Sequence, residues 1–206
     1  MSRKKKIYEM VLFSLLTTII IVMSFTPLGF IRIPALGLEI TFLMIPVAVG
    51  AILLGPLYGA LLGFIFGFTS LLQCVFGTSA FGATLLTINP IYTIIVCVVS
   101  RTLMGYLTGL IYKLLEKKLK DSVVSHIITC ASSSILNTLF FMSLLCLCFY
   151  NTEYLQSIGT GLGTSNVFAF VIAFVGINGL VEAGVNIVIG AAVSKVIAVN
   201  FKKKYK

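Results

Sequence analysis

The stretch 55–67 reads GPLYGALLGFIFG and places Gly55, Gly59, Gly63 and Gly67 four residues apart in otherwise apolar sequence. This spacing puts the four glycines on one face of a helix. Glycine inside a helix costs about 1 kcal/mol relative to alanine, so the repeat needs a structural reason. Between helices in lipid, small residues let two backbones approach closely. The stretch therefore predicts a membrane helix that packs tightly against a neighbour.

The composition of the whole chain fits a membrane protein. Its 206 residues are 59% hydrophobic and only 10% charged, which is outside the range of soluble domains. Several apolar runs have the roughly 20 residues that a helix needs to cross a bilayer, and they lack the alternation of barrel strands. The first run is too long for a cleavable signal. We therefore expect a single all-α polytopic domain over residues 1–206, in the plasma membrane.

Basic residues indicate how the helices cross the membrane. All 15 Lys and Arg residues except Arg32 and Arg101 fall into three clusters, within 3–6, 113–120 and 195–206. The positive-inside rule places these clusters, and hence both the N and C termini, in the cytosol. An even number of crossings must separate each pair of clusters. Together with the hydrophobic lengths, this predicts six transmembrane helices.

The apolar runs give approximate bounds for these helices. The expected spans are 7–25, 41–54, 56–76, 90–115, 122–149 and 166–197. The second is short and interrupted by Pro46. Three segments face outward, near 27–40, 77–89 and 150–165. Their prolines and glycines are typical either of ordered lids over a pocket or of simple turns.

Sequence signals for catalysis and for metal binding are missing. The five cysteines form no C-x-x-C pair, and no H-E-x-x-H occurs. The only histidine, His126, starts the fifth helix on the cytosolic side, and no G-x-S-x-G accompanies it. The chain has no P-loop for ATP. We expect neither an enzyme nor a bound metal or cofactor, and no nucleic-acid partner.

A second pair of glycines, Gly105 and Gly109, repeats the spacing on the fourth helix. Helices three and four are therefore a candidate tight pair, packed through these glycines and those of 55–67. The alternative is that the glycine ridge is a sliding surface for an external partner.

Arg101 and Glu182 lie deep inside apolar segments, where an ionisable residue is costly and is a functional candidate. They are almost equally far from the cytosolic residues Lys113 and Lys195, so their depths differ by only about 1.5 Å at the helical rise. We therefore expect the two charges at one level, in a geometry that permits a salt bridge between helices four and six.

Two amides extend this polar level. Asn178 lies one turn from Glu182, and Asn137 is at a similar depth on the fifth helix. Either these residues only lock the bundle, or they line a pocket open outward. In such a pocket, a ligand carboxylate binds Arg101 bidentately and its hydroxyls or amides meet Asn137, Asn178 and Glu182. A purely structural ion pair moves the expected pocket outward, toward Arg32, Asn89 and Tyr92.

Four stretches resemble a known family, the substrate-binding S components of energy-coupling factor (ECF) vitamin transporters. IPVAVGAILLGPLYGALLGFIFGFTSLL at 45–72 resembles the family's second and third helices, with an I-P dipeptide followed by L-G-P-x-x-G-x-x-x-G. The stretches 100–115, 135–141 and 177–197 are similar to its fourth, fifth and sixth helices. The resemblance covers nearly the whole chain.

This resemblance implies a six-helix subunit in the lipid bilayer that captures a vitamin outside the cell. It also implies assembly with a transmembrane coupling subunit and two cytosolic ATPases, which use the ATP that this chain does not bind. Members of the family carry small residues on helix one that dock the coupling subunit. Ser14 and Thr18 occupy the corresponding positions here, with Thr17 beside them.

Within the family, TPLGFIRIP at 26–34 and GFIFGFTSLL at 63–72 are most similar to the pantothenate-type members. Pantothenate has a carboxylate and hydroxyls that suit Arg101 and the amides. The alternatives are an S component for another vitamin such as riboflavin or folate, and a membrane scaffold whose glycine ridge and ion pair are purely structural.

Overall fold

The computed structural model describes residues 3–27, 29–33, 38–119, 122–164 and 166–205, with the backbone alone at 30–33, 38–40, 177–178 and 201–205. The helices of its first half are α1 (Arg3–Ser24), α2 (Met44–Leu54), α3 (Pro56–Val75) and α4 (Ala80–Ile88). One continuous helical rod follows, made of α5 (Pro90–Ile94), the π-helical turn η2 (Ile95–Val99) and α6 (Ser100–Leu119).

The second half has a similar arrangement. It contains α7 (Val123–Phe149), the short α8 (Glu153–Gly161), and a second long rod. This rod consists of α9 (Val167–Val185), the π-helical turn η3 (Asn186–Gly190) and α10 (Ala191–Tyr205). Each long rod therefore contains one π-turn, at which the helix is locally widened by an extra residue.

The helices confirm the prediction of an all-α polytopic membrane protein. Within the described residues, five stretches are long and apolar enough to cross a bilayer: Arg3–Ser24, Pro56–Val75, Pro90–Leu119, Val123–Phe149 and Gly179–Asn200. The second predicted helix, α2, has 11 residues and is short, as expected. Pro46 does not interrupt it, because the proline lies in the first turn of the helix, where a backbone N–H has no intrahelical partner.

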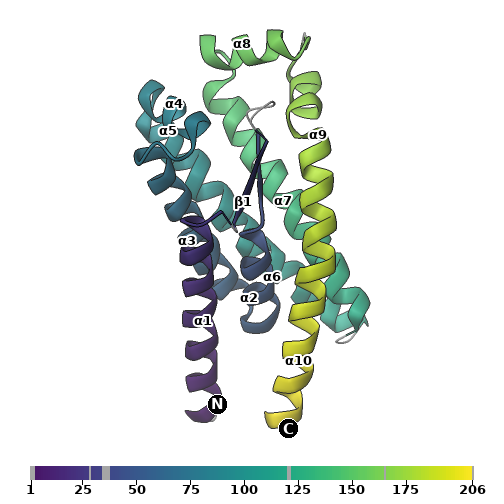
Figure 1. Ribbon diagram of the computed structural model, residues 1–206. Coiled ribbons are helices and arrows are strands. Elements are labelled where there is room, and N and C mark those ends of the chain that lie inside the picture. The colour runs from purple at the N-terminus through teal and green to yellow at the C-terminus, as the bar shows by residue number, and fades with distance from the viewer. Residues whose placement is uncertain (1–2, 28, 34–37, 120–121, 165, 206) are drawn as a thin grey trace.

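Both ends of the described chain lie at the same end of the bundle, and α4 and α8 lie at the opposite end (Figure 1). This arrangement agrees with an even number of crossings. The segments expected near 77–89 and 150–165 are thus not open loops, because each contains a short helix. That the termini face the cytosol stays a prediction from the basic clusters.

The second predicted helix starts later than residue 41, because the residues before it form a β-hairpin. Strand β1 (Phe30–Ile33) pairs antiparallel with β2 (Leu38–Thr41), with Arg32 opposite Glu39. The hairpin lies amid the helices rather than outside them (Figure 1), and β2 contacts α9. Its last residue, Thr41, thereby reaches the interior of the bundle.

The glycines at 59, 63 and 67 lie in a close contact between α3 and the rod of η2 and α6. A Cβ atom at Gly59 would collide with the carbonyl oxygen of Gly105, and one at Gly63 would collide with the carbonyl oxygen of Arg101. A Cβ at Gly67 would lie 2.6 Å from the oxygen of Cys97. The ridge therefore packs inside this chain, in the tight pair that the spacing predicts.

Gly55 has a different role from the other three glycines. It ends α2 and precedes α3 with φ of +100°, and a Cβ there would meet no atom within 4 Å. Its positive φ, which favours glycine, makes the turn between the two helices. Gly109 completes the ridge, because its Cβ would lie 2.5 Å from the Cα of Pro56 in the first turn of α3.

The apolar core has two larger parts, beside a small third part around Ala48, Tyr112 and Cys130. One part joins α1, α2, α3 and α6, and its buried members include Leu16, Ile20, Met44, Phe66 and Met104. The other joins α4, η2, α7, α8 and α9, and its buried members include Leu85, Val96, Leu145, Leu155 and Phe170. The second part surrounds the polar cavity described next.

Candidate substrate-binding site

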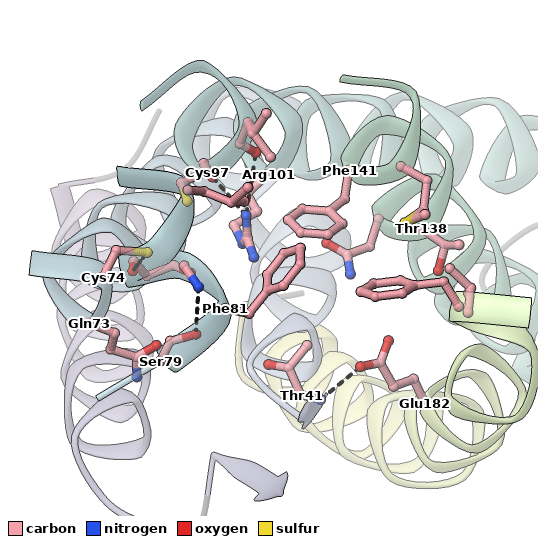
Figure 2. A pocket seen from close by; sticks show the side chains of 18 of the residues that line it. Thr41, Gln73, Cys74, Ser79, Phe81, Cys97, Arg101, Thr138, Phe141 and Glu182 are labelled. Atoms are coloured by element: carbon pink, nitrogen blue, oxygen red, sulfur yellow. Dashed lines mark hydrogen bonds between the residues drawn. The ribbon is translucent and has the colours of Figure 1, made fainter. Parts of the chain in front are cut away.

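A cavity of about 160 Å³ lies among α3, α4, η2, α6, α7 and α9, and Thr41 at the end of β2 also lines it (Figure 2). Its polar wall contains the charged groups of Arg101 and Glu182, together with Ser70, Gln73, Ser79, Asn137 and Thr138. Its apolar wall contains Phe81, Leu85, Val96, Phe141, Met142 and Phe174. Polar groups that converge in a largely apolar cavity are typical of small-molecule sites.

Arg101 is held on the cavity wall by carbonyls and aromatic rings. Its Nη1 donates to the carbonyl oxygens of Cys97 at 3.0 Å and Val96 at 3.5 Å. Its Cζ lies 4.8 Å from the ring centroid of Phe66 and 5.2 Å from that of Phe141, within cation–π range. Its buried Nε has no hydrogen-bond partner. The guanidinium therefore has a fixed position and an unused donor.

Glu182 is 8% exposed, and its Oε1 accepts a hydrogen bond from the backbone N–H of Thr41 at 2.7 Å. Figure 2 shows Glu182 and Arg101 on different sides of the cavity. Both residues are described, and no ion pair joins them, so the expected salt bridge is not formed. Equal depth along two helices does not fix the direction in which each side chain points, and a nearby N–H already binds the carboxylate.

Asn137 projects from α7 into the same cavity and is 7% exposed. Its Oδ1 is buried without a hydrogen-bond partner. A buried polar atom left without a partner costs about 1–3 kcal/mol, so such atoms in a native structure call for an explanation. Two residues that line the cavity, Arg101 and Asn137, thus each carry a buried polar atom without a hydrogen-bond partner.

Aromatic rings border the cavity on the side of α4 and α8. Phe81 of α4 packs against Phe174 of α9 with ring centroids 5.5 Å apart, and against Tyr154 of α8 at 5.9 Å. Phe174 in turn stacks on Phe170 at 5.3 Å. The segment expected near 77–89 is therefore an ordered wall of the cavity, which supports its interpretation as a lid over a pocket.

Other predicted site residues lie elsewhere. Asn89 does not line the cavity: it caps α5, and its Oδ1 accepts from the backbone N–H of Tyr92 at 3.1 Å. Tyr92 is 43% exposed and packs edge-on against Phe149. Neither Asn89 nor Tyr92 is among the residues that line the cavity. The side chains of Arg32 and Asn178 are outside the described part of the chain.

The residues predicted to dock a coupling subunit lie on α1. Ser14 and Thr18 are exposed, and the hydroxyl of Thr18 donates to the carbonyl oxygen of Ser14 at 2.9 Å. That bond leaves little polarity on a surface of exposed apolar side chains such as Val11 and Leu15. Thr17 points elsewhere, and its hydroxyl is buried without a hydrogen-bond partner.

Several lining residues were missed by the sequence analysis. Gln73 and Ser79 are ordinary polar residues near a helix end, and Phe81 is one of 16 phenylalanines, so nothing marks them individually. Thr41 lines the cavity because it ends strand β2, and the sequence analysis did not predict this strand. Among the described residues, no group of three or more His, Cys, Asp and Glu side chains is placed to hold a metal ion.

The model of a family described as "ECF transporter, substrate-specific component" matches residues 8–194. No curated protein matches the chain.

Proposed function

Because the chain belongs to the family of ECF transporter substrate-specific components, we propose that its cavity captures pantothenate from outside the cell. Members of this family are substrate-binding components of transporters rather than enzymes, and they work with a membrane coupling subunit and ATPases. The family and the apolar spans make the chain a multi-pass protein of the plasma membrane. In this proposal, one coupling subunit and two cytosolic ATPases supply the energy of transport.

The observation that carries the choice of substrate is the guanidinium of Arg101, fixed on the cavity wall with its Nε unpaired. A carboxylate that binds this group forms charge-assisted hydrogen bonds, which are stronger than those between neutral groups. Arginine is also the cation best suited to planar, two-point recognition of a carboxylate. Pantothenate has a carboxylate at one end of an extended molecule.

The opposite end of pantothenate carries two hydroxyls, and an amide lies between the two ends. Glu182 and Asn137 both line the cavity, and both side chains carry oxygen acceptors that suit hydroxyl or amide donors. Glu182 and Arg101 lie on different sides of the cavity (Figure 2), so a ligand with an anion at one end and donors at the other matches both walls.

The size of the cavity also favours a small vitamin. About 160 Å³ is below the 300–1,000 Å³ that is common for sites of drug-sized ligands. Riboflavin, with three fused rings, and folate, with a pteridine, a benzoyl group and glutamate, are both much larger than pantothenate. A cavity with these walls supports pantothenate over the two larger vitamins.

Calorimetry on the purified chain tests the proposal with four ligands: pantothenate, riboflavin, folate, and pantothenyl alcohol, which replaces the carboxylate by a hydroxyl. We expect pantothenate to bind and to stabilise the fold by about 2.7 kcal/mol at a hundredfold excess over Kd. Pantothenyl alcohol loses the charged contact, worth about 1.5–3 kcal/mol, so its Kd rises at least about tenfold. Binding of riboflavin or folate without pantothenate contradicts the choice of substrate.

A further inference from the structure

One glycine of the cavity wall is not needed for the packing of the helices. Gly82 and Gly179 both line the cavity. A Cβ at Gly82 would collide with the Sγ of Cys74, so this glycine lets α4 pack on α3. A Cβ at Gly179 would meet only side chains of the described residues, the Cγ1 of Val175 at 3.0 Å and the Oγ1 of Thr138 at 3.8 Å. The missing side chain of Gly179 therefore leaves a space in the wall instead of a close contact between backbones.

The stability of the bundle gives no reason for a glycine at position 179. Val175 lies one turn earlier on the same helix, α9, and its methyl group needs to shift by only a few tenths of an ångström to accept an alanine at 179. Alanine also favours a helix more than glycine does. Room for a ligand is a reason that remains, because Gly179 lines the cavity.

The threonine next to this space has an unused hydroxyl. A threonine in a helix commonly donates to the carbonyl one turn earlier, as Thr129 of α7 does to the carbonyl oxygen of Ser125 at 2.7 Å. Thr138 of the same helix makes no hydrogen bond in the described part of the chain, and its oxygen is not fully enclosed by protein atoms. Because Thr138 lines the cavity, its hydroxyl is available to a ligand.

An acceptor lies beside the same space. Glu182 follows Gly179 by three residues, so both lie on one face of α9. Its carboxylate accepts the N–H of Thr41 and has further lone pairs for other donors. Figure 2 shows Thr138 and Glu182 on the side of the cavity away from Arg101. This side therefore combines room for apolar groups with two side chains that bind hydroxyls.

We propose that Gly179, Thr138 and Glu182 form a subsite for a branched diol at the end of the ligand. In pantothenate, this end has a carbon with two methyl groups between two carbons that each carry a hydroxyl. The methyl groups occupy the space at Gly179 beside Val175, and the hydroxyls bind Thr138 and Glu182, while the carboxylate binds Arg101. The inference rests on the proposed capture of pantothenate and adds that Gly179 makes the site specific for the branched end.

Calorimetry with two ligands tests the role of Gly179: pantothenate, and its analogue in which both methyl groups are replaced by hydrogen. We expect the wild type to prefer pantothenate at least about tenfold, because even one methylene in an apolar pocket is worth about that much. In Gly179→Ala the new methyl group fills the space, so the Kd for pantothenate rises at least about tenfold, the Kd for the analogue changes little, and the preference disappears. Gly184→Ala, at an exposed glycine of α9 outside the cavity, is the matched control and keeps the preference.

Two substitutions test the hydroxyl of Thr138. Thr138→Val keeps the shape of the side chain and removes one hydrogen bond to the ligand, so we expect the Kd for pantothenate to rise about two- to tenfold. The melting temperature of the ligand-free protein stays the same, because this hydroxyl bonds to no other group of the described chain. Thr138→Ser keeps the hydroxyl and binds within about twofold of the wild type. Normal binding by Thr138→Val overturns the subsite as proposed.

Thermal unfolding and the wild-type affinities separate the remaining outcomes. We expect the ligand-free Gly179→Ala protein to melt at the wild-type temperature or above it. A lower melting temperature assigns Gly179 to packing and overturns the subsite, as does a Gly179→Ala protein that keeps the preference or loses affinity for both ligands equally. If the wild type binds pantothenate without preference over the analogue, only the subsite fails. If the wild type binds neither ligand, the proposed substrate fails as well.

Discussion

The backbone N–H of Thr41 and the carboxylate of Glu182 are joined by a hydrogen bond of 2.7 Å, which ties the end of strand β2 to helix α9 across 141 residues of sequence. Both groups are buried and line the cavity. The hairpin that precedes α2 is therefore connected directly to the wall of the cavity.

This bond predicts different effects for two substitutions at Glu182. Glu182→Gln keeps a side-chain acceptor for the N–H of Thr41, so we expect the melting temperature of the ligand-free protein to change little. Glu182→Met leaves that buried N–H without a partner, which costs about 1–3 kcal/mol. Thermal unfolding in detergent measures both. Equal losses in the two variants contradict a role for the hydrogen bond.

A second prediction concerns Arg101. Arg101→Lys keeps the positive charge but loses the planar fork and its stacking between Phe66 and Phe141. We expect the Kd for pantothenate to rise at least about tenfold, about 1.4 kcal/mol, in titration calorimetry. Lys113→Arg, at an exposed position far along the same rod, is the matched control and leaves the Kd unchanged. An Arg101→Lys protein that binds pantothenate normally removes Arg101 from the site.

A substitution of Asn137 is expected to affect the melting temperature and the affinity for pantothenate in different ways. Its Oδ1 is buried and unpaired in the ligand-free protein, so Asn137→Leu removes an unsatisfied polar atom. We expect the melting temperature without ligand to stay the same or rise, while pantothenate affinity falls at least about tenfold. A fall in stability with normal binding assigns Asn137 to the packing of the bundle instead.

The close contact between α3 and α6 predicts that large side chains at the glycine positions destabilise the fold. Gly59→Leu and Gly63→Leu force side chains into the carbonyls of Gly105 and Arg101, at a cost of several kcal/mol. Leu61→Ala, on the same helix but with Leu61 51% exposed, is the control and costs little. Size-exclusion chromatography and thermal unfolding compare the three. Equal tolerance means that the spacing of the glycines has no structural role.

Labelling in whole cells tests on which side of the membrane the termini lie. Glu153 is exposed in the first turn of α8, at the end of the bundle opposite the termini. In a background without native cysteines, Glu153→Cys reacts with an impermeant maleimide in intact cells, whereas Lys118→Cys reacts only after permeabilisation. The reverse pattern places the termini outside.

Most of the fold follows from local sequence, and the site follows only in part. Apolar runs and basic clusters predict the long helices, and the spacing of Gly59 and Gly63 predicts a tight helix pair. The hairpin was missed because pairing of 30–33 with 38–41 depends on burial inside the bundle and not on an alternating pattern. Arg101, Asn137 and Glu182 do meet in one cavity. Their depth was predictable, but the directions of Arg101 and Glu182 around their helix axes were not.

The two π-turns are one reason why the directions of the Arg101 and Glu182 side chains could not be predicted from the sequence. A π-turn holds one residue more than an α-turn, so everything on one side of it is rotated by about 100° relative to an uninterrupted helix. One such turn lies just before Arg101 and the other just after Glu182. Gaining or losing a single residue at 95–99 or 186–190 therefore rotates the part of the helix that lies beyond the π-turn. Single-residue changes in length at these two π-turns can thus reshape the walls of the cavity while the contacts of Gly59 with Gly105 and of Gly109 with Pro56 keep their alignment.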